Sequence, residues 1–430
     1  MNIIDSTQSD FDTLFDALLQ RGKMDIDGVS ATVKAILDDV KQNGDEALLQ
    51  DIRKFDNWEP NDISEIKISA KSMKEAYDDL DEELSKALHL AYERIFSYHQ
   101  KQMPKSWLDF EENGSVLGQK VTALDRAGLY IPGGKAAYPS SLLMNAIPAI
   151  VAGVKEIVVC TPTPNNEINS LLLAAMHLCG IKEAYKIGGA GAIAAMAYGT
   201  GSIAKTDVVT GPGNIYVATA KKLVYGDVNI DMIAGPSEIG IIADESANVD
   251  FLAVDLLSQA EHDQMASSLL ITTSAQVAKD TLDAIYRELG KLQREDIARE
   301  SIEKRGAIII VRDLDEALYY MNKIAPEHLE LMVANPFDLL PYIKHAGAIF
   351  MGPYTPEPMG DYIAGPNHTL PTGGSARFYS PLNVENFLKR SSIISLSPKG
   401  MDELAKACAL LAKTEGLDAH QRSVEIRLEK

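Results

Sequence analysis

From about residue 127 onward, short runs rich in β-branched and aromatic residues alternate with longer segments whose apolar residues recur at helical spacing. Alternation of this kind is typical of a parallel sheet covered by helices on both faces. The first half of the region therefore predicts one doubly wound unit. Its expected strands are 128–131, 156–160, 184–187, 207–210 and 228–231, and its expected helices are 139–152, 166–179, 190–198 and 213–225.

The same alternation continues in the second half of the chain. The expected strands there are 239–243, 268–272, 307–311 and 329–333, and the expected helices are 248–261, 275–290 and 313–323. No close sequence repeat links the two halves, so only their architecture is shared. The predicted fold class is α/β, with two tandem Rossmann-like doubly wound units, a helical N-terminal segment and a small C-terminal tail.

The segments before and after the alternating region have other residue patterns. Residues 1 to about 105 are predicted to be helical, because they contain few glycines and periodic apolar positions, as at 29–37 and 69–102. Residues 352–382 are rich in Gly and Pro and show no helical or strand period. Long structureless loops in compact proteins are usually functional, so we expect this stretch to contribute to a site.

The C-terminal tail is predicted to form a helix, a loop and a short strand. The helix starts near Pro398, the loop covers 415–420, and residues 424–428 alternate as in a strand. Because the tail is too small to bury a core of its own, it must dock on another surface. The apolar face that the helix offers for this consists of Met401, Leu404, Cys408 and Leu411.

Composition narrows the class of protein. A chain of 430 residues with 46% hydrophobic and 24% charged residues is typical of a soluble protein of two domains. The net charge of −20 argues against nucleic acid and anionic membranes as partners. The three cysteines have no metal-binding or disulfide spacing, which suits a reducing cytoplasm. We expect no signal peptide at the polar start, and the apolar stretch 142–154 is too short to span a bilayer.

Glycine-rich turns follow three expected strands of the first unit. In a parallel sheet such turns gather at the carboxyl ends of the strands, where helix N-termini offer free N–H groups to anionic ligands. Each turn alone is explained equally well by the need for glycine in a tight turn, but the three together favour nucleotide binding. They are Ile131-Pro132-Gly133-Gly134, Ile187-Gly188-Gly189-Ala190-Gly191-Ala192 and Gly211-Pro212-Gly213-Asn214.

Polar residues that suit a metal site occur in the second unit and the tail. Gln259 and His262 are three residues apart at the end of an expected helix, so their side chains share one face. Asp361 lies in the irregular stretch, and His420 lies in the tail. Nitrogen and oxygen donors without thiolate suit zinc or another divalent ion. Read singly, His262 could be a helix-capping residue and Asp361 a turn residue.

Adjacent Glu327 and His328 follow an expected helix and could both reach one cleft, although an exposed charged turn explains them equally well. His368 is interpreted as a residue that stabilises its loop. The remaining histidines outside these clusters are interpreted as structural; they are His89, His99, His177 and His345.

Taken together, these motifs resemble the histidinol dehydrogenase family and run in the family's order through nearly the whole chain. The resemblance rests on the turns given above and on several further stretches. These are Ala234-Gly235-Pro236-Ser237-Glu238, Ser258-Gln259-Ala260-Glu261-His262, Ala325-Pro326-Glu327-His328-Leu329, Gly360-Asp361-Tyr362, Gly365-Pro366-Asn367-His368, Leu370-Pro371-Thr372-Gly373-Gly374, and Glu415-Gly416-Leu417 with His420.

The resemblance implies zinc- and NAD-dependent oxidation of L-histidinol to L-histidine through bound L-histidinaldehyde, the last steps of histidine biosynthesis. It implies Glu327 and His328 as the catalytic acid–base pair. It also implies three sets of binding residues: Gln259, His262, Asp361 and His420 for zinc; Ser237, His328 and Glu415, with the zinc ligands, for substrate; and Tyr130 and Asn214 for NAD. Gly191 stands where the family usually has a glutamine that contacts NAD.

The resemblance further implies a cytoplasmic homodimer with exchanged tails and shared active sites. The implied division of the chain is an N-terminal helical segment 1–26, an α/β domain 27–126 with 236–381 that carries most of the zinc and catalytic site, an NAD-binding α/β domain 127–235, and a tail domain 382–430. Two alternatives remain at this point. One is a related zinc and NAD enzyme for another polar alcohol, such as a sulfonated diol, and the other is a non-redox zinc hydrolase or a binding protein.

Overall fold

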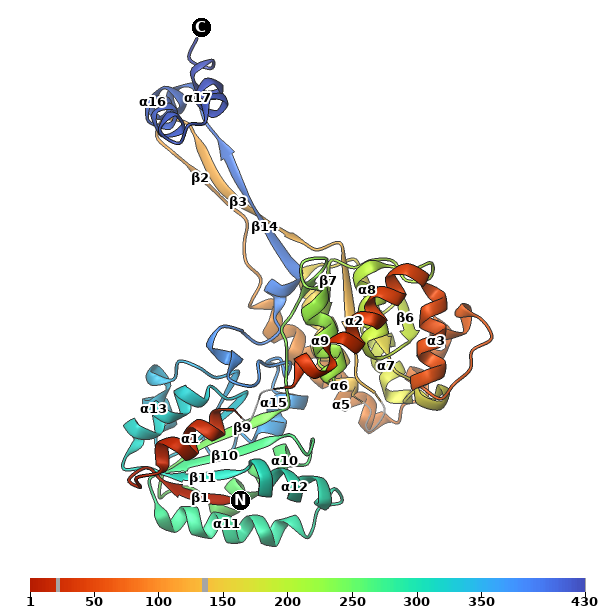
Figure 1. The fold of residues 1–430 in the computed structure, drawn as a ribbon, viewed down its shortest axis with the longest axis vertical. Coiled ribbons are helices and arrows are strands. Elements are labelled where there is room, and N and C mark those ends of the chain that lie inside the picture. Colours follow the sequence, from red (N-terminus) through yellow and green to blue (C-terminus); the bar gives the residue numbers. More distant parts are fainter. Residues whose placement is uncertain (21–23, 134–137, 430) are drawn as a thin grey trace. The chain divides into compact units, whose positions relative to one another are not determined.

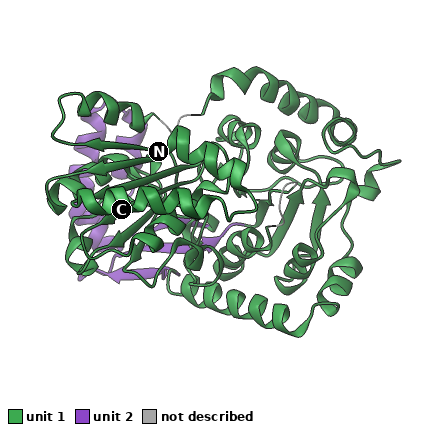
Figure 2. Cartoon of the chain, turned by 90° about the horizontal axis from the view of Figure 1, so that it is seen from below, with its two compact units in different colours: residues 1–102, 125–387 green, residues 103–124, 388–430 purple. Residues whose placement is uncertain are grey.

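The computed structural model describes all residues except 21–23, 134–137 and 430. The chain divides into two compact units (Figure 2). Unit 1 comprises Met1–Gln102 and Asp125–Phe387, and unit 2 comprises Met103–Leu124 and Leu388–Lys430. No helix among the described residues is long and apolar enough to cross a membrane.

The first predicted sheet is confirmed as a five-stranded parallel sheet in unit 1 (Figure 1). Its order, β6-β5-β4-β7-β8, places the first strand of the series in the middle, with later strands added on both sides. The strands are β4 (Arg126–Tyr130), β5 (Glu156–Thr161), β6 (Glu183–Lys186), β7 (Val208–Thr210) and β8 (Asn229–Ile230), and the helices that connect them are α6 (Pro139–Ala152), α7 (Ser170–Leu178), α8 (Gly189–Tyr198) and α9 (Ile215–Val224).

The second predicted sheet is a six-stranded parallel sheet with the order β1-β11-β10-β9-β12-β13. All six residues of its central strand β9 are buried, because helices cover both faces of the sheet. The strands are β1 (Asn2–Asp5), β9 (Glu238–Ala243), β10 (Ser267–Thr272), β11 (Ala307–Ile310), β12 (His328–Met332) and β13 (Ala348–Met351), and the helices are α1 (Phe11–Leu19), α10 (Val249–Ala260), α11 (Ala275–Leu289), α12 (Glu295–Arg305) and α13 (Leu314–Ile324).

The prediction that the whole N-terminal region is helical was wrong at its start. Residues Asn2–Asp5 form β1, which pairs in parallel with Ala307–Ile310 of β11. Four residues are too few to show a period, and the strand gains its hydrogen bonds only from a partner about three hundred residues away. The remaining N-terminal helices do form; they are α2 (Ile26–Asn43), α3 (Asp45–Phe55), α4 (Ala70–Asp78) and α5 (Glu82–Gln100).

These helices lie beside the five-stranded sheet. Helix α2 packs against α8 and α9, α3 against α8, α4 against α7, and α5 against α6. Val33, Leu37 and Leu48 share one apolar core with residues of α8 such as Ile193. The predicted division grouped residues 27–126 with 236–381. Helices α2 to α5 instead pack against helices of residues 127–235. The boundaries of the functional domains remain a prediction.

Unit 2 consists of a three-stranded antiparallel sheet, β14-β3-β2, followed by two helices. The sequence did not indicate this sheet, because its strands come from two segments far apart in the chain and β2 is exposed along its length. The elements are β2 (Trp107–Phe110), β3 (Val116–Ala123), β14 (Leu388–Ser395), α16 (Pro398–Thr414) and α17 (Asp418–Glu425) (Figure 1).

Two details of the predicted tail were wrong. Residues 418–425 form α17, so the expected loop 415–420 ends early and the expected strand 424–428 does not form. An alternating run of five residues fits a short helix as well as a strand, so its period cannot distinguish the two structures. In α16 the buried residues are Gly400, Ala405 and Ala409, whereas Leu404, Cys408 and Leu411 of the predicted apolar face are exposed.

Candidate functional site

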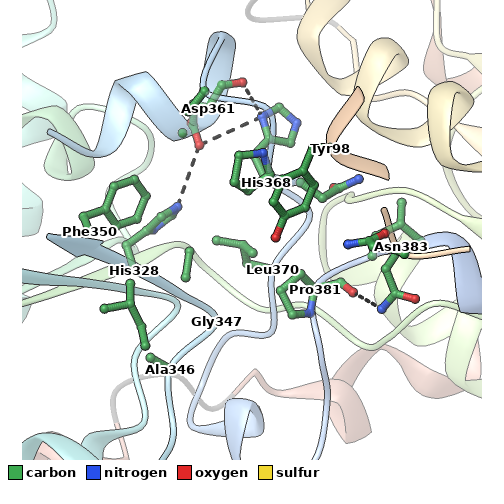
Figure 3. A pocket seen from close by; sticks show the side chains of 18 of the residues that line it. Tyr98, His328, Ala346, Gly347, Phe350, Asp361, His368, Leu370, Pro381 and Asn383 are labelled. Atoms are coloured by element: carbon green, nitrogen blue, oxygen red, sulfur yellow. Dashed lines mark hydrogen bonds and ion pairs between the residues drawn. The ribbon is translucent and has the colours of Figure 1, made fainter. Parts of the chain in front are cut away.

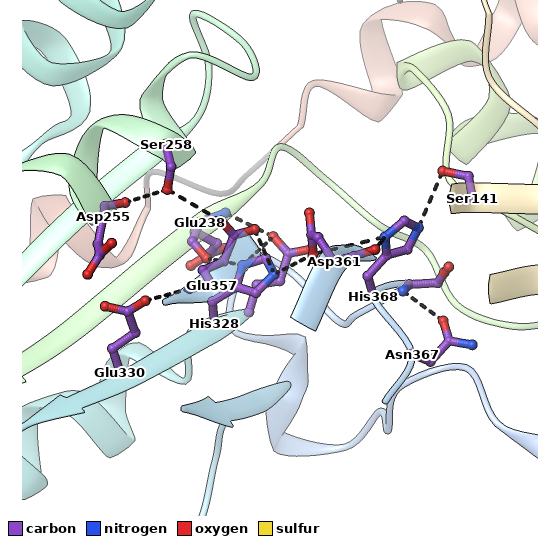
Figure 4. Close-up of polar contacts among 12 residues, drawn as sticks. Ser141, Glu238, Asp255, Ser258, His328, Glu330, Glu357, Asp361, Asn367 and His368 are labelled. Atoms are coloured by element: carbon purple, nitrogen blue, oxygen red, sulfur yellow. Dashed lines mark hydrogen bonds and ion pairs between the residues drawn. The ribbon is translucent and has the colours of Figure 1, made fainter. Parts of the chain in front are cut away.

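The backbone of Glu238, at the start of β9, holds both Glu327 and His328 in place. Its N–H donates to the Glu327 carboxylate at 2.9 Å, and its carbonyl oxygen accepts from His328 Nδ1 at 3.1 Å (Figure 4). Because a carbonyl only accepts hydrogen bonds, Nδ1 carries a proton, and Nε2 is the ring nitrogen that can gain or lose one. Both side chains are nearly fully buried, and His328 Nε2 has no hydrogen-bond partner among the described residues.

Two further carboxylates lie near His328 Nε2. The Glu357 carboxylate is 3.7 Å away and the Asp361 carboxylate is 3.8 Å away. Burial lowers the pKa of His328, but the negative charges of Glu327, Asp361 and Glu357 outweigh it and raise the pKa to about 10. Burial, above all, raises the pKa of Glu327 to about 8. Glu327, Glu357 and Asp361 thus share one buried space with a single imidazole, where the ionised form of a carboxyl group is costly without a further cation.

Glu357, Asp361 and His262 offer ligand atoms that all lie within 4.8 Å of one another. Glu357 and Asp361 are four residues apart on α15 (Glu357–Tyr362), so their side chains share one face of that short helix. His262 follows α10, which crosses from the carboxyl end of β9 back to the amino end of β10. The end of α10 therefore returns to the sheet edge where β9 and β12 begin.

Gln259, in the last turn of α10, is fully buried, and both its amide oxygen and its amide nitrogen lack a hydrogen-bond partner among the described residues. A buried amide without partners is costly and needs an explanation. A divalent cation accepts an amide oxygen, an imidazole nitrogen and carboxylate oxygens together. The donor set, the close spacing of its carboxylates and the unpartnered amide of Gln259 therefore fit such an ion.

Glu357 is the one member of this cluster that the sequence analysis missed. The stretch 352–382 was interpreted as irregular, so no helical spacing was sought there, yet Glu357–Tyr362 is helical. The i, i+4 spacing of two acidic residues was the available signal. The same stretch carries His368, whose ring contacts the Asp361 carbonyl oxygen at 3.0 Å and the Ser141 hydroxyl at 3.3 Å, in agreement with its interpretation as a loop-stabilising residue.

Two cavities adjoin the cluster. One, of about 550 Å³, is lined by His328, Asp361 and His368 together with Tyr98 and Phe350 (Figure 3). The other, of about 360 Å³, includes His262, Tyr138, Arg294 and Tyr362 in its lining. Small-molecule sites are concave and combine apolar walls with a few polar groups, and the first cavity has this character.

The structure places the other predicted site residues as follows. Ser237 immediately precedes β9 and is half-buried, next to the Glu238 backbone that holds Glu327 and His328. Glu415 ends α16 and His420 lies in α17, so both belong to unit 2, and both are exposed. Unit 1 thus brings together Glu327, His328, Asp361 and His262, with Gln259 one helical turn before His262, whereas the predicted metal ligand His420 belongs to unit 2.

The three glycine-rich turns lie at the carboxyl edge of the five-stranded sheet. The Tyr130 hydroxyl, at the end of β4, accepts from the Gly189 N–H at 3.2 Å, and the Asn214 side chain caps α9. A Cβ at Gly188 would lie 2.4 Å from the Pro162 side chain, so only glycine fits there. Gly134, in the first turn, lies outside the described residues. Tyr130 and Asn214 therefore shape these turns, whatever they bind.

A buried ion pair fixes the turn after β7. The Lys221 ammonium contacts the Asp231 carboxylate and donates to the Gly211 carbonyl oxygen at 2.9 Å, while Asp231 accepts from the Gly211 N–H at 2.8 Å. Both side chains are almost fully buried. The pair thus satisfies both backbone groups of Gly211 and holds the path of the chain toward Asn214.

Lys221→Met is expected to lower the free energy of unfolding by about 3–5 kcal/mol, because it leaves the Asp231 carboxylate buried without its cation. Urea unfolding followed by circular dichroism measures the loss. Lys222→Met, at the exposed neighbouring position, is the matched control and should change stability little. Equal stabilities of the two variants would show that the Lys221 pair does not hold the turn.

The fold and the cluster define an α/β enzyme with acid–base groups at one sheet edge and glycine-rich turns at the edge of another sheet. A family model described as histidinol dehydrogenase matches residues 19–428. The histidinol dehydrogenases of Wolinella succinogenes and Sulfurimonas denitrificans are 65% and 64% identical to the chain; the alignments cover 99% of this chain and 98% and 99% of theirs. The crystal structure of the Elizabethkingia anophelis histidinol dehydrogenase superposes with a TM-score of 0.94 at 34% identity, over 100% of this chain and 98% of that one. The chain therefore belongs to the histidinol dehydrogenase family and is an oxidoreductase.

Proposed function

We propose that the chain catalyses the zinc- and NAD-dependent oxidation of L-histidinol to L-histidine through bound L-histidinaldehyde, the last steps of histidine biosynthesis. Family membership supports the substrate and the reaction. The observation that carries the chemistry is the orientation of His328. The Glu238 carbonyl fixes the proton on Nδ1 and leaves Nε2 facing the cluster of Glu357 and Asp361.

In this proposal Gln259, His262, Asp361 and His420 bind zinc, and Ser237 and Glu415 contact the substrate. Zinc would hold the nitrogen atoms of the substrate and offset the negative charge of the carboxylates. The free amide of Gln259 and the closeness of His262 to Asp361 support the first three ligands. His420 comes from the resemblance alone.

The residues of the chain divide the four-electron oxidation into two steps. In the first, His328 Nε2 would take the hydroxyl proton, because the zinc charge would offset the carboxylates that raise the pKa of His328. NAD would accept the hydride from the same carbon, and the product would be the aldehyde. In the second, Glu327 in its ionised form would take a proton from water as the water oxygen attacks the aldehyde carbon. A second NAD would accept the hydride of the hydrated carbon, and the product would be the carboxylic acid. Burial of Glu327 and His328 keeps solvent from competing with these proton transfers.

The glycine-rich edge of the five-stranded sheet is the proposed NAD site, with Tyr130, Gly191 and Asn214 as its contacts. The edge lies at the point where strand order reverses around β4, which is where doubly wound sheets bind nucleotides. Among the described residues, the N–H groups of Ala190 and Gly191 in the first turn of α8 have no hydrogen-bond acceptor. Such groups bind phosphate oxygens.

We further propose that the tail of unit 2 completes the site of a second copy of the chain. Its helices α16 and α17 expose apolar residues, of which Leu404, Leu411 and Ile426 are half or more exposed. An apolar surface of this kind favours association. The partner is assigned as a second copy because the family that the chain resembles forms homodimers with exchanged tails.

The function is tested by adding L-histidinol to the zinc-loaded protein with NAD and following NADH absorbance. We expect two NADH and one histidine for each histidinol. A sulfonated diol should give no NADH, and turnover of that diol in place of histidinol would assign the chain to another substrate.

Removal of the metal by a chelator is expected to abolish turnover and to leave the far-UV circular dichroism native, because two α/β cores of this size fold without a metal. Added zinc should restore the rate. Full activity of protein shown by elemental analysis to be free of metal would contradict the zinc assignment.

A further inference from the structure

Asp51 is a half-buried carboxylate next to the first turn of α8. It lies in α3, and its Oδ2 atom is 2.5 Å from the position that a Cβ would occupy at Gly191. A side chain at position 191 would therefore collide with the carboxylate. The space beside Gly191 is thus filled by a charged group from another helix, α3.

The Asp51 carboxylate has no hydrogen bond or ion pair to any of the described residues. Burial, followed by the charge of Asp39, raises the pKa of Asp51 to about 6, while Lys54 opposes this rise. The group is nevertheless ionised at neutral pH, and a partly desolvated carboxylate without a donor destabilises the folded chain. Groups of this kind are concentrated at functional sites, where a ligand supplies the missing donor.

The surroundings of Asp51 indicate the chemistry of that donor. Ala190 and Gly191 offer N–H groups to a phosphate at the start of α8, and Asp51 lies at the same turn. A carboxylate beside a phosphate would repel it, whereas a ribose joined to that phosphate offers two hydroxyl donors. In nucleotide-binding sheets an acidic residue that accepts from the ribose favours NAD, because the 2′-phosphate of NADP is anionic.

We propose that Asp51 is a specificity-determining residue of the cofactor site, which accepts hydrogen bonds from the adenosine ribose of NAD and disfavours NADP. The proposal rests on the proposed NAD site at this sheet edge. Gly191 admits the carboxylate, so Asp51 and Gly191 act as a pair at the first turn of α8.

The direct test is the dissociation constants of NAD and NADP, measured by calorimetry without substrate. Asp51→Asn removes the charge and keeps the size. It should weaken NAD binding by roughly tenfold or more, as for loss of a hydrogen bond to a charged group, and bring the NADP constant closer to that of NAD. Asp39→Asn is the matched control, because it removes a nearby charge that acts on Asp51 but does not lie at Gly191; it should leave both constants unchanged.

Two further variants keep the test decisive if Asp51→Asn folds poorly. Position 191 lies inside a helix, where alanine is favourable. The methyl group of Gly191→Ala would displace the Asp51 carboxylate, so this variant should also weaken NAD binding. Asp51→Glu keeps the charge and should keep the preference for NAD. Circular dichroism confirms that each variant is folded.

The outcomes separate this inference from the function on which it rests. If the wild type binds NAD and oxidises histidinol, but Asp51→Asn and Gly191→Ala bind NAD and NADP as Asp39→Asn does, Asp51 does not select the cofactor and only this inference is overturned. If the wild type binds neither cofactor, the proposed NAD site and this inference are overturned together.

Discussion

Glu327→Gln is expected to stop the oxidation of histidinol after the first hydride transfer. Glutamine keeps the oxygen that accepts from the Glu238 N–H, so the strand start and His328 stay in place. It cannot take a proton from water, and a general base contributes typically about 10²–10⁴-fold to a rate. The second half of the reaction should slow by roughly this factor, while the first keeps its base, His328.

Single-turnover kinetics distinguish the two halves. With excess NAD, Glu327→Gln should release one NADH for each site at close to the normal rate, and the second should follow slowly. His328→Asn is the informative contrast, because it removes the base of the first step and should slow the first NADH as well. If Glu327→Gln forms both NADH equivalents at the normal rate, Glu327 does not activate the water.

The parts of the fold that could be predicted are those whose residues carry their own signal. Buried parallel strands such as 239–243 and 268–272 are continuous apolar runs, and they form β9 and β10 almost as expected. Strand β1 was missed because it has only four residues and pairs with a strand distant in the chain. The sheet of unit 2 was missed because β2 and most of β14 are exposed and show no buried apolar run.

The candidate site was predictable to a similar degree. The spacing of Gln259 and His262 placed both on one face of a helix end, and adjacent Glu327 and His328 do share one buried space. Their meeting with Asp361 could not be derived from spacing, because it depends on α10 returning to the amino edge of the six-stranded sheet. The same limit applies to Asp51. It lies close to Gly191 because α3 packs against α8, and no sequence pattern predicts that these two helices are neighbours.

Two inactive variants are expected to restore activity to each other if the tail serves the partner subunit. One carries Glu327→Gln in its body with an intact tail, and the other carries His420→Asn in its tail with an intact body. Each homodimer has the same lesion in both sites and should be nearly inactive. In a mixed dimer with exchanged tails, the intact body of the second chain meets the intact tail of the first, and one complete site forms.

The mixed dimer is isolated by placing a different affinity tag on each chain and purifying on both. Its activity should be roughly half that of the wild type, because a two-fold symmetric dimer has two sites and one of them is complete. A matched control pairs Glu327→Gln with His328→Asn, so that both lesions lie in the body. Exchange of tails cannot repair either body, and this mixed dimer should stay inactive.

The alternative arrangement gives the opposite result. If His420 served its own subunit, each site of the Glu327→Gln and His420→Asn mixed dimer would carry one lesion, and no activity would return. Recovery in this pair but not in the control pair therefore assigns His420 to the partner's site. Absence of recovery in verified mixed dimers would contradict the exchange, and the exposed apolar residues of α16, among them Leu404 and Leu411, would then need another partner surface.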